Sequence, residues 1–145
     1  MPRGRRLVPL AVCSLALTAC GGGGTPAATS TAASTATVVT PGLNPPSGCY
    51  VTVFLVETVT KTQIAQVKRL LVSNRLITQV SFVPKELQLR RFTRTNPAAA
   101  KGMVVNPFAD RFEVVPRTHG SVFAIVGDFA THGGPITNVK PSAAC

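Results

Sequence analysis

YVTVFLVETVTKTQIAQVKRLLVSNRLITQVSFV, residues 50–83, is the stretch that decides the fold of this chain. Residues 50–56 are rich in β-branched and aromatic side chains and predict a buried strand. Thr60 and Gln63 stand three residues apart before a helical apolar pattern, which predicts a capping box at a helix start. That helix is expected to end at Ser73-Asn74, and the alternation over 77–83 predicts a second, half-buried strand. The stretch therefore predicts a strand–helix–strand unit.

Further elements follow toward the C-terminus. Pro84 suits the first turn of a helix, which we expect over 84–94, and residues 96–105 have no regular pattern. A third strand is predicted over 111–115, a second amphipathic helix over 122–129 and a last strand over 136–140. The order predicts an α+β fold, the ferredoxin-like split βαβ sandwich with a four-stranded antiparallel sheet and two helices. A short helical excursion would separate strands two and three.

Two cysteines bound this domain, which we place at 49–145. In the ferredoxin-like plan the first and last strands are antiparallel neighbours, so Cys49 and Cys145 are expected to lie close together. Export would remove Cys13 and lipidation would occupy Cys20, which leaves two thiols in an oxidising compartment. We expect a disulfide between them. Two free cysteines are the alternative, and metal binding is less expected because neither has a Cys or His at ligand spacing.

The first twenty residues have the layout of an export signal. Three arginines and no acid precede an uncharged run over 7–19, which is too short to span a bilayer. Leu17-Thr18-Ala19-Cys20 then resembles the lipobox of bacterial lipoproteins. The resemblance implies a signal peptide over 1–19 and a diacylglyceryl group on the Cys20 sulfur, which would anchor the protein on the extracytoplasmic face of the cell membrane. An ordinary signal peptide with an incidental Cys20 is the alternative.

Residues 20–48 join that anchor to the domain. After Cys20 they are mostly Gly, Thr, Ala, Ser and Pro, without a charge, and predict a flexible linker. The whole chain has 15 basic and 5 acidic side chains. Removal of the signal peptide would take away three arginines and leave a mature protein with a formal net charge of 12 − 5 = +7.

A family resemblance rests chiefly on NPFADRFEV at 106–114. It resembles the extracellular domain of the FtsX family, the permease subunit of the bacterial cell-division ABC transporter, which typically reads Asn-Pro-Leu-Pro-Asp-Ser-Phe-Glu-Val there. FVPKE at 82–86, LRRF at 89–92 and the looser GPITNV at 134–139 extend the resemblance over 51–140. Pro84 departs from the family's Ser, and the four transmembrane helices of the permease are not predicted. The chain thus resembles that domain as a freestanding lipoprotein.

The resemblance implies a non-catalytic domain that binds another envelope protein. Such a partner would be a peptidoglycan hydrolase, its activator or a component of the division complex, held by an exposed apolar surface on the excursion. The residues carried over to that surface are Leu89, Phe92, Met103 and Phe108. Alternatively, Leu89 and Phe92 only cover the domain's own core. Within the Asn-Pro segment, Pro107 keeps Asn106 out of the helical region, and an Asx-type turn is expected to lead into the third strand.

The sequence offers little chemistry for catalysis. Asp110 and Glu113 flank a strand start and are expected to be solvated or to cap a turn. His119 and His132 lie in predicted loops, and no nucleophile elbow supports an assembly of Ser121, a histidine and Asp128. We therefore expect no enzyme activity, metal, cofactor or small-molecule substrate.

A run of basic residues supports a second hypothesis. It consists of Lys85, Arg90, Arg91, Arg94 and Lys101. Nucleic acid is not expected outside the membrane, but anionic lipid or cell-wall polymer would attract this surface. In that case the protein is a structural lipoprotein without a protein partner. A solvated helix face with no ligand is the third interpretation.

Overall fold

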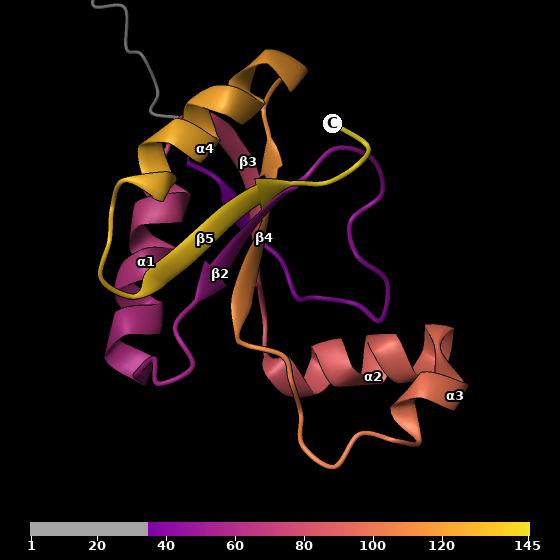
Figure 1. The fold of residues 1–145 in the computed structure, drawn as a ribbon. Coiled ribbons are helices and arrows are strands. Elements are labelled where there is room, and N and C mark those ends of the chain that lie inside the picture. Colours follow the sequence, from indigo (N-terminus) through magenta and orange to yellow (C-terminus); the bar gives the residue numbers. More distant parts are fainter. Residues whose placement is uncertain (1–34) are drawn as a thin grey trace, which may run out of the picture. The chain divides into compact units, whose positions relative to one another are not determined.

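The structure, a computed structural model, describes residues 35–145. The predicted signal peptide 1–19, the lipidation site Cys20 and the linker before Thr35 lie outside the described residues. Within them the chain forms one five-stranded sheet with helices, drawn in Figure 1. The strands are β1 (Thr37–Val38), β2 (Val51–Leu55), β3 (Ile77–Val83), β4 (Arg111–Pro116) and β5 (Ile136–Pro141). The helices are α1 (Lys61–Ser73), α2 (Lys85–Thr95), α3 (Pro97–Ala100) and α4 (Val122–Ala130), with a 3₁₀ turn, η1 (His119–Ser121), before α4.

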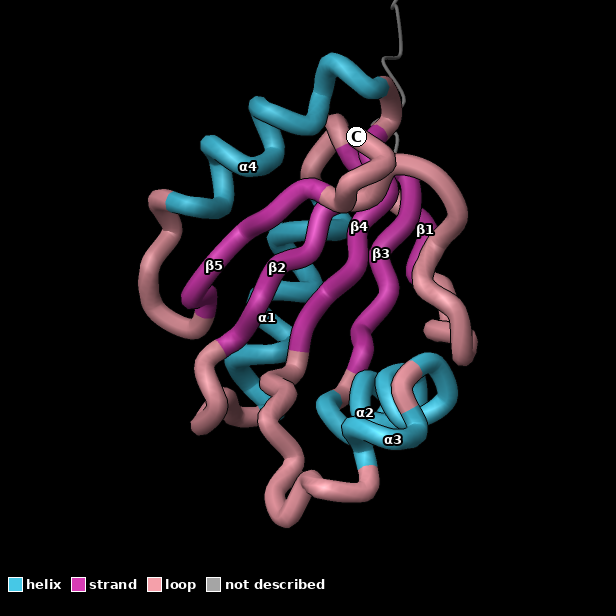
Figure 2. Tube along the Cα trace, turned by 45° about the vertical axis from the view of Figure 1, so that its right-hand side comes forward, coloured by secondary structure: helices cyan, strands magenta, loops and turns pink. Residues whose placement is uncertain are grey.

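The strand order is β1-β3-β4-β2-β5. β2, β3, β4 and β5 are antiparallel neighbours in the order of the ferredoxin-like plan, so that predicted fold is confirmed. β1 is an addition, because it extends the sheet beyond β3 in the parallel direction. Figure 2 shows the five strands side by side.

One face of the sheet carries the core. Val53 and Phe112 are register partners, and both point to the side on which α1 and α4 pack. Val67 of α1 and Ile125 of α4 belong to the same buried cluster. The residues that alternate with these on the strands include Glu113, and they point to the opposite, more polar face. The alternation of apolar and polar residues along the strands therefore determines which face of the sheet is buried in the core.

Local signals placed the element ends correctly. The Thr60 side chain accepts from the Gln63 backbone N–H, and the Gln63 side chain accepts from the Thr60 N–H at 2.9 Å, so the predicted capping box is present. After α4, Gly133 and Gly134 have φ of 57° and 64°. Only glycine adopts that conformation without strain, and it turns the chain back into β5. The segment 96–105 is less irregular than expected, because α3 begins there at Pro97.

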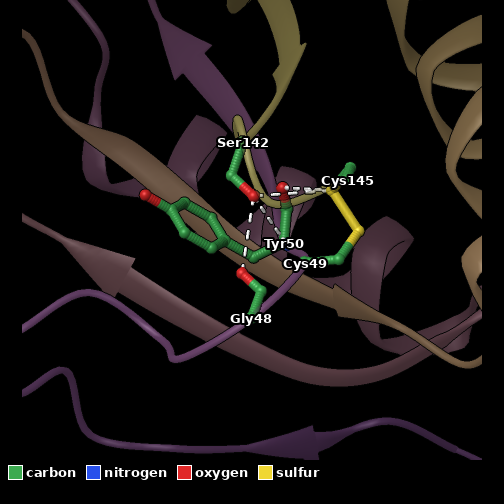
Figure 3. The surroundings of a disulfide bond; sticks show 5 residues. All are labelled: Gly48, Cys49, Tyr50, Ser142 and Cys145. Atoms are coloured by element: carbon green, nitrogen blue, oxygen red, sulfur yellow. Dashed lines mark hydrogen bonds between the residues drawn. A yellow bond between two sulfur atoms is a disulfide. The ribbon is translucent and has the colours of Figure 1, made fainter.

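A disulfide closes the domain. Cys49 and Cys145 are bonded, with their Cα atoms 4.6 Å apart. Figure 3 shows Ser142 beside this bond: its N–H donates to the Tyr50 carbonyl at 2.8 Å, and its hydroxyl accepts from the Tyr50 N–H at 3.2 Å. The predicted pairing is present because β2 and β5 are antiparallel neighbours.

The expectation of a flexible linker does not hold for residues 35–48. Ala36 is buried in the core, and its N–H donates to the Val72 carbonyl. Thr37 and Val38 form β1, and residues 39–48, which we call the strap, then cross toward α2. The composition of this segment gave no sign of the contact, because backbone groups at a sheet edge pair without any bulky side chain.

Candidate functional site

α2, α3 and the loop that leads to β4, residues 85–110, form the excursion, which projects from one end of the sheet in Figure 1. Its four predicted surface residues, Leu89, Phe92, Met103 and Phe108, are all half-buried. None of them belongs to the core cluster or packs against it. Leu89 and Phe92 therefore do not cover the part of the core that α1 and α4 form.

Polar contacts attach the start of α2 to the start of β4. Pro84 occupies the N-cap position and provides no side-chain cap. The Asp110 carboxylate instead accepts the Lys85 N–H at 2.9 Å, and the Gln88 amide donates to the Ala109 carbonyl. Asp110 therefore replaces the missing cap from across the excursion. On the same loop the Asn106 side chain accepts the Phe108 N–H at 3.0 Å, so the predicted Asx turn is confirmed.

A buried ion pair attaches the middle of α2. Arg91 and Glu113 are only 8% and 1% exposed, and a guanidinium nitrogen of Arg91 lies 2.6 Å from a carboxylate oxygen of Glu113. Arg111 contacts the same carboxylate oxygen at 2.6 Å. Arg91 also donates to the strap carbonyls of Gly42 and Asn44. One guanidinium therefore joins the helix, the sheet and the strap.

Two expectations are corrected by this ion pair. Glu113 is neither solvated nor a turn cap, because its position on β4 faces the side of the sheet that α2 and the strap cover. Arg91 is not part of a solvated basic surface, because its charge is used inside the domain.

The four predicted surface residues form two pairs on neighbouring faces of α2. The rings of Phe92 and Phe108 pack in a tilted arrangement, with centroids 5.6 Å apart and an interplanar angle of 53°. Leu89 and Met103 instead line a pocket of about 400 Å³ between α2, α3 and the loop after α3. Leu89 and Phe92 are three residues apart, which places their side chains about 60° apart around a helix of 3.6 residues per turn. Each side chain therefore meets a different one of the two neighbouring pockets.

The most exposed apolar side chains of the excursion are Val104 and Val105, at 98% and 77%. They line the same pocket as Leu89 and Met103. Sequence reasoning missed them because they lie outside every periodic pattern. Their signal is two adjacent β-branched apolar residues in a segment that predicts neither a strand nor a helix.

The remaining basic residues are distributed over the excursion. Lys85, Arg90, Arg94 and Lys101 are exposed. Arg94 donates to the Asn44 side chain and lies beside Phe92 and Phe108, whereas Lys101 lines the pocket of Leu89 and Met103. Arg90 lines neither of these two pockets.

The candidate catalytic residues are engaged elsewhere. Ser121 hydrogen-bonds to the Thr118 hydroxyl at 2.8 Å, and the His132 ring lies 2.6 Å from the Asp128 backbone carbonyl. Over residues 35–145, no three Cys, His, Asp or Glu side chains are grouped as a metal site. In that same range no helix has the length and apolar character needed to cross a membrane.

The geometry defines a class of protein: a small ferredoxin-like domain with an apolar excursion held on by polar contacts. Residues 49–139 match the family model of the FtsX extracellular domain, and the chain belongs to that family. No curated protein sequence matches the chain.

Two solved structures have the same fold. One is the crystal structure of extracellular domain 1 of FtsX from Streptococcus pneumoniae in complex with undecyl-maltoside. It has a TM-score of 0.56 and 18% identity, and the match covers 67% of this chain and 97% of that one. The other is the solution structure of the large extracellular loop of FtsX in Streptococcus pneumoniae, with a TM-score of 0.54, 20% identity, and coverage of 64% and 98%.

Proposed function

We propose that this protein is a non-catalytic, lipid-anchored docking module whose excursion binds a cell-envelope protein. The partner class that the family resemblance supports is a peptidoglycan hydrolase or a component of the division complex. The observation that carries the proposal is the exposure of Val104 and Val105 beside the pocket of Leu89 and Met103. Contiguous apolar groups left in water are typical of an interaction surface, whereas single ones are not.

The attachment of the excursion suits this role. Its helix is fixed by hydrogen bonds, an ion pair and one buried apolar side chain, Leu87, so Leu89 and Phe92 stay only half-buried. A rigid platform with free apolar groups loses little conformational entropy when a partner binds. The related pneumococcal domain was crystallised with undecyl-maltoside, a detergent with an apolar chain, which is compatible with an apolar surface in this family.

Anchoring would keep the domain close to the membrane. With residues 35–48 attached to the domain, the proposed linker from Cys20 to Thr35 is 15 residues long. As a flexible chain it would span roughly 20 Å, taking about 5–6 Å times the square root of its length. The docking surface would thus act in the space just outside the cytoplasmic membrane.

The test is capture of envelope proteins by the full chain and by two charge-introducing variants. Val105→Asp alters the excursion, and Phe123→Asp is the matched control because Phe123 is 84% exposed on α4. Recovery of a wall hydrolase or division protein by the native chain and the control, with loss in Val105→Asp, is the expected result.

The competing function is a structural lipoprotein that binds anionic polymer or lipid through its basic surface. It predicts equal binding of wall fragments or anionic vesicles by all three chains, weakened steeply by salt, with no protein recovered. That result would overturn the docking module.

A further inference from the structure

The strap and α2 line a second pocket, of about 290 Å³, on the neighbouring face of the helix. Both views show the bend of the strap beside α2 (Figures 1 and 2). Leu43 and Pro45 of the strap form one wall, and the aromatic pair Phe92–Phe108 forms another. Such a volume lies at the small end of ligand pockets, so it suits a side chain better than a cofactor.

The polar lining of this pocket is cationic. Arg91, Arg94 and Arg111 line it, and the one carboxylate that contacts two of them is Glu113. The three guanidinium groups and the one carboxylate have a formal net charge of 3 − 1 = +2. Arg91 is occupied, because Glu113 and the strap carbonyls accept from all its nitrogens.

The other two arginines differ in what they can offer a ligand. The buried Nε of Arg111 and the buried Oε2 of Glu113 both lack a hydrogen-bond partner in the described residues, and they belong to the same ion pair, so Arg111 contributes its charge rather than a free donor. Arg94 uses one nitrogen on Asn44 and is otherwise exposed to the pocket opening. A planar guanidinium fork matches a carboxylate, and the exposed donors of Arg94 are the ones that a ligand in the pocket can reach.

We propose that this pocket binds a carboxylate side chain of the docked protein, next to an aromatic or aliphatic residue of the same segment. The inference rests on the proposed function and names the chemistry that the partner must carry. The +2 charge selects the carboxylate, and the walls of Phe92, Phe108 and Leu43 select the apolar neighbour. Phe108 contacts both this pocket and a second hollow that includes Val105, so the two sites form one continuous surface.

The strap is part of this site. Without Leu43, Asn44 and Pro45 the pocket would lose a wall and the partner of Arg94. The segment that leads toward the proposed anchor is therefore also part of the recognition surface.

The first test uses a small probe with the full chain. 3-Phenylpropanoate carries a ring and a carboxylate, 3-phenylpropanamide has the same shape without the charge, and inorganic phosphate has the charge without the ring. Ligand-observed saturation-transfer NMR should detect 3-phenylpropanoate with a dissociation constant in the millimolar range. We expect the amide to bind about tenfold more weakly, because the ion pairs are lost.

Two variants locate the site. Arg94→Glu should weaken 3-phenylpropanoate at least about tenfold, whereas Arg90→Glu, the same charge change on the same helix, should not. Both residues are exposed, so neither change should unfold the domain, which a melting curve checks. Three results would overturn the proposal. They are equal binding of the acid and the amide, an equal loss of affinity for 3-phenylpropanoate in both variants, and binding of phosphate as tight as that of 3-phenylpropanoate.

Capture of the protein partner separates this inference from the proposed function. Arg94→Glu should reduce capture while Arg90→Glu retains it. If Val105→Asp abolishes capture and Arg94→Glu does not, the docking module stands and the carboxylate site is wrong. If wall fragments bind through Arg94 instead and no protein does, the carboxylate belongs to wall peptide and both proposals fail.

Discussion

The sheet core and the excursion are held together by different forces. On the core face, α1 and α4 bury Val67, Leu71, Ile125 and Phe129 against the strands. The excursion buries one large apolar side chain, Leu87, and otherwise depends on polar contacts. These are made by Asp110, Gln88 and the pair Arg91–Glu113, and its other large apolar groups are half-buried or exposed. Burial of apolar area stabilises a fold without specifying direction, whereas hydrogen bonds and ion pairs fix one geometry.

This difference explains how so small a domain presents an apolar surface. If the excursion were attached by apolar packing alone, more of its apolar side chains than Leu87 would be buried, and Leu89 or Met103 would be consumed in the contact. Polar attachment leaves them available to a partner while α2 stays in place. The cost is a buried carboxylate with two guanidinium groups, which is stable only while every member is present.

The largest effect is expected in the core. Phe112→Ala removes a fully buried ring that packs against the Phe82 ring, with centroids 5.2 Å apart. It should lower the free energy of unfolding by about 3–5 kcal/mol, measured by urea denaturation. Amide exchange should accelerate equally in α1 and α2, because the whole domain loses stability. Faster exchange confined to α1 would contradict a single cooperative core.

The next effect separates the two regions. Glu113→Gln leaves Arg91 and Arg111 without a compensating charge and should cost about 3 kcal/mol, the lower end for a broken buried pair, because the amide still accepts hydrogen bonds. Hydrogen exchange should accelerate more over 85–95 and in the strap than over 61–73. A uniform increase in exchange rate along the chain would show that Glu113 stabilises the whole domain and not the excursion in particular.

Two helix caps allow a matched comparison at smaller magnitude. Thr60→Ala removes the cap of α1, and Asp110→Ala removes the acceptor at the start of α2. Each should cost about 1 kcal/mol locally. Thr60→Ala should lower the midpoint of global unfolding, whereas Asp110→Ala should mainly raise exchange in the first turn of α2. If Asp110→Ala lowered the midpoint of global unfolding more than Thr60→Ala does, the comparison would be reversed.

The smallest change in stability is expected at the proposed docking surface. Val105→Asp replaces a side chain that is 77% exposed, so the free energy of unfolding should shift by no more than about 0.5 kcal/mol. A loss above about 2 kcal/mol in urea denaturation would mean that Val105 belongs to the fold of the excursion.

The fold was predictable because its signals are local. The Thr60–Gln63 capping box and the alternation over 77–83 each specify an element end or a face within a few residues. The disulfide followed from the strand order, because Cys49 and Cys145 lie at the adjoining ends of β2 and β5.

The interactions that position the candidate site were not predictable in this way. Glu113 meets Arg91 across 22 residues, and that contact depends on the register of β4 and the angle of α2. Residues 39–48 pack through backbone carbonyls, which any composition provides. Of the surface residues, Phe92 and Phe108 were found through family resemblance, whereas Val104 and Val105 have no periodicity that marks them.

The central claim is that the excursion, and not the helical face of the domain, meets a partner. The most direct measurement replaces Val104, and separately Phe123, by the photo-crosslinking amino acid p-benzoylphenylalanine in living cells. These positions are 98% and 84% exposed, so they sample the surroundings almost equally well. We predict a discrete protein adduct, a wall hydrolase or division protein, from position 104 and none from position 123. The same adducts from both positions, or none from position 104, would contradict the account.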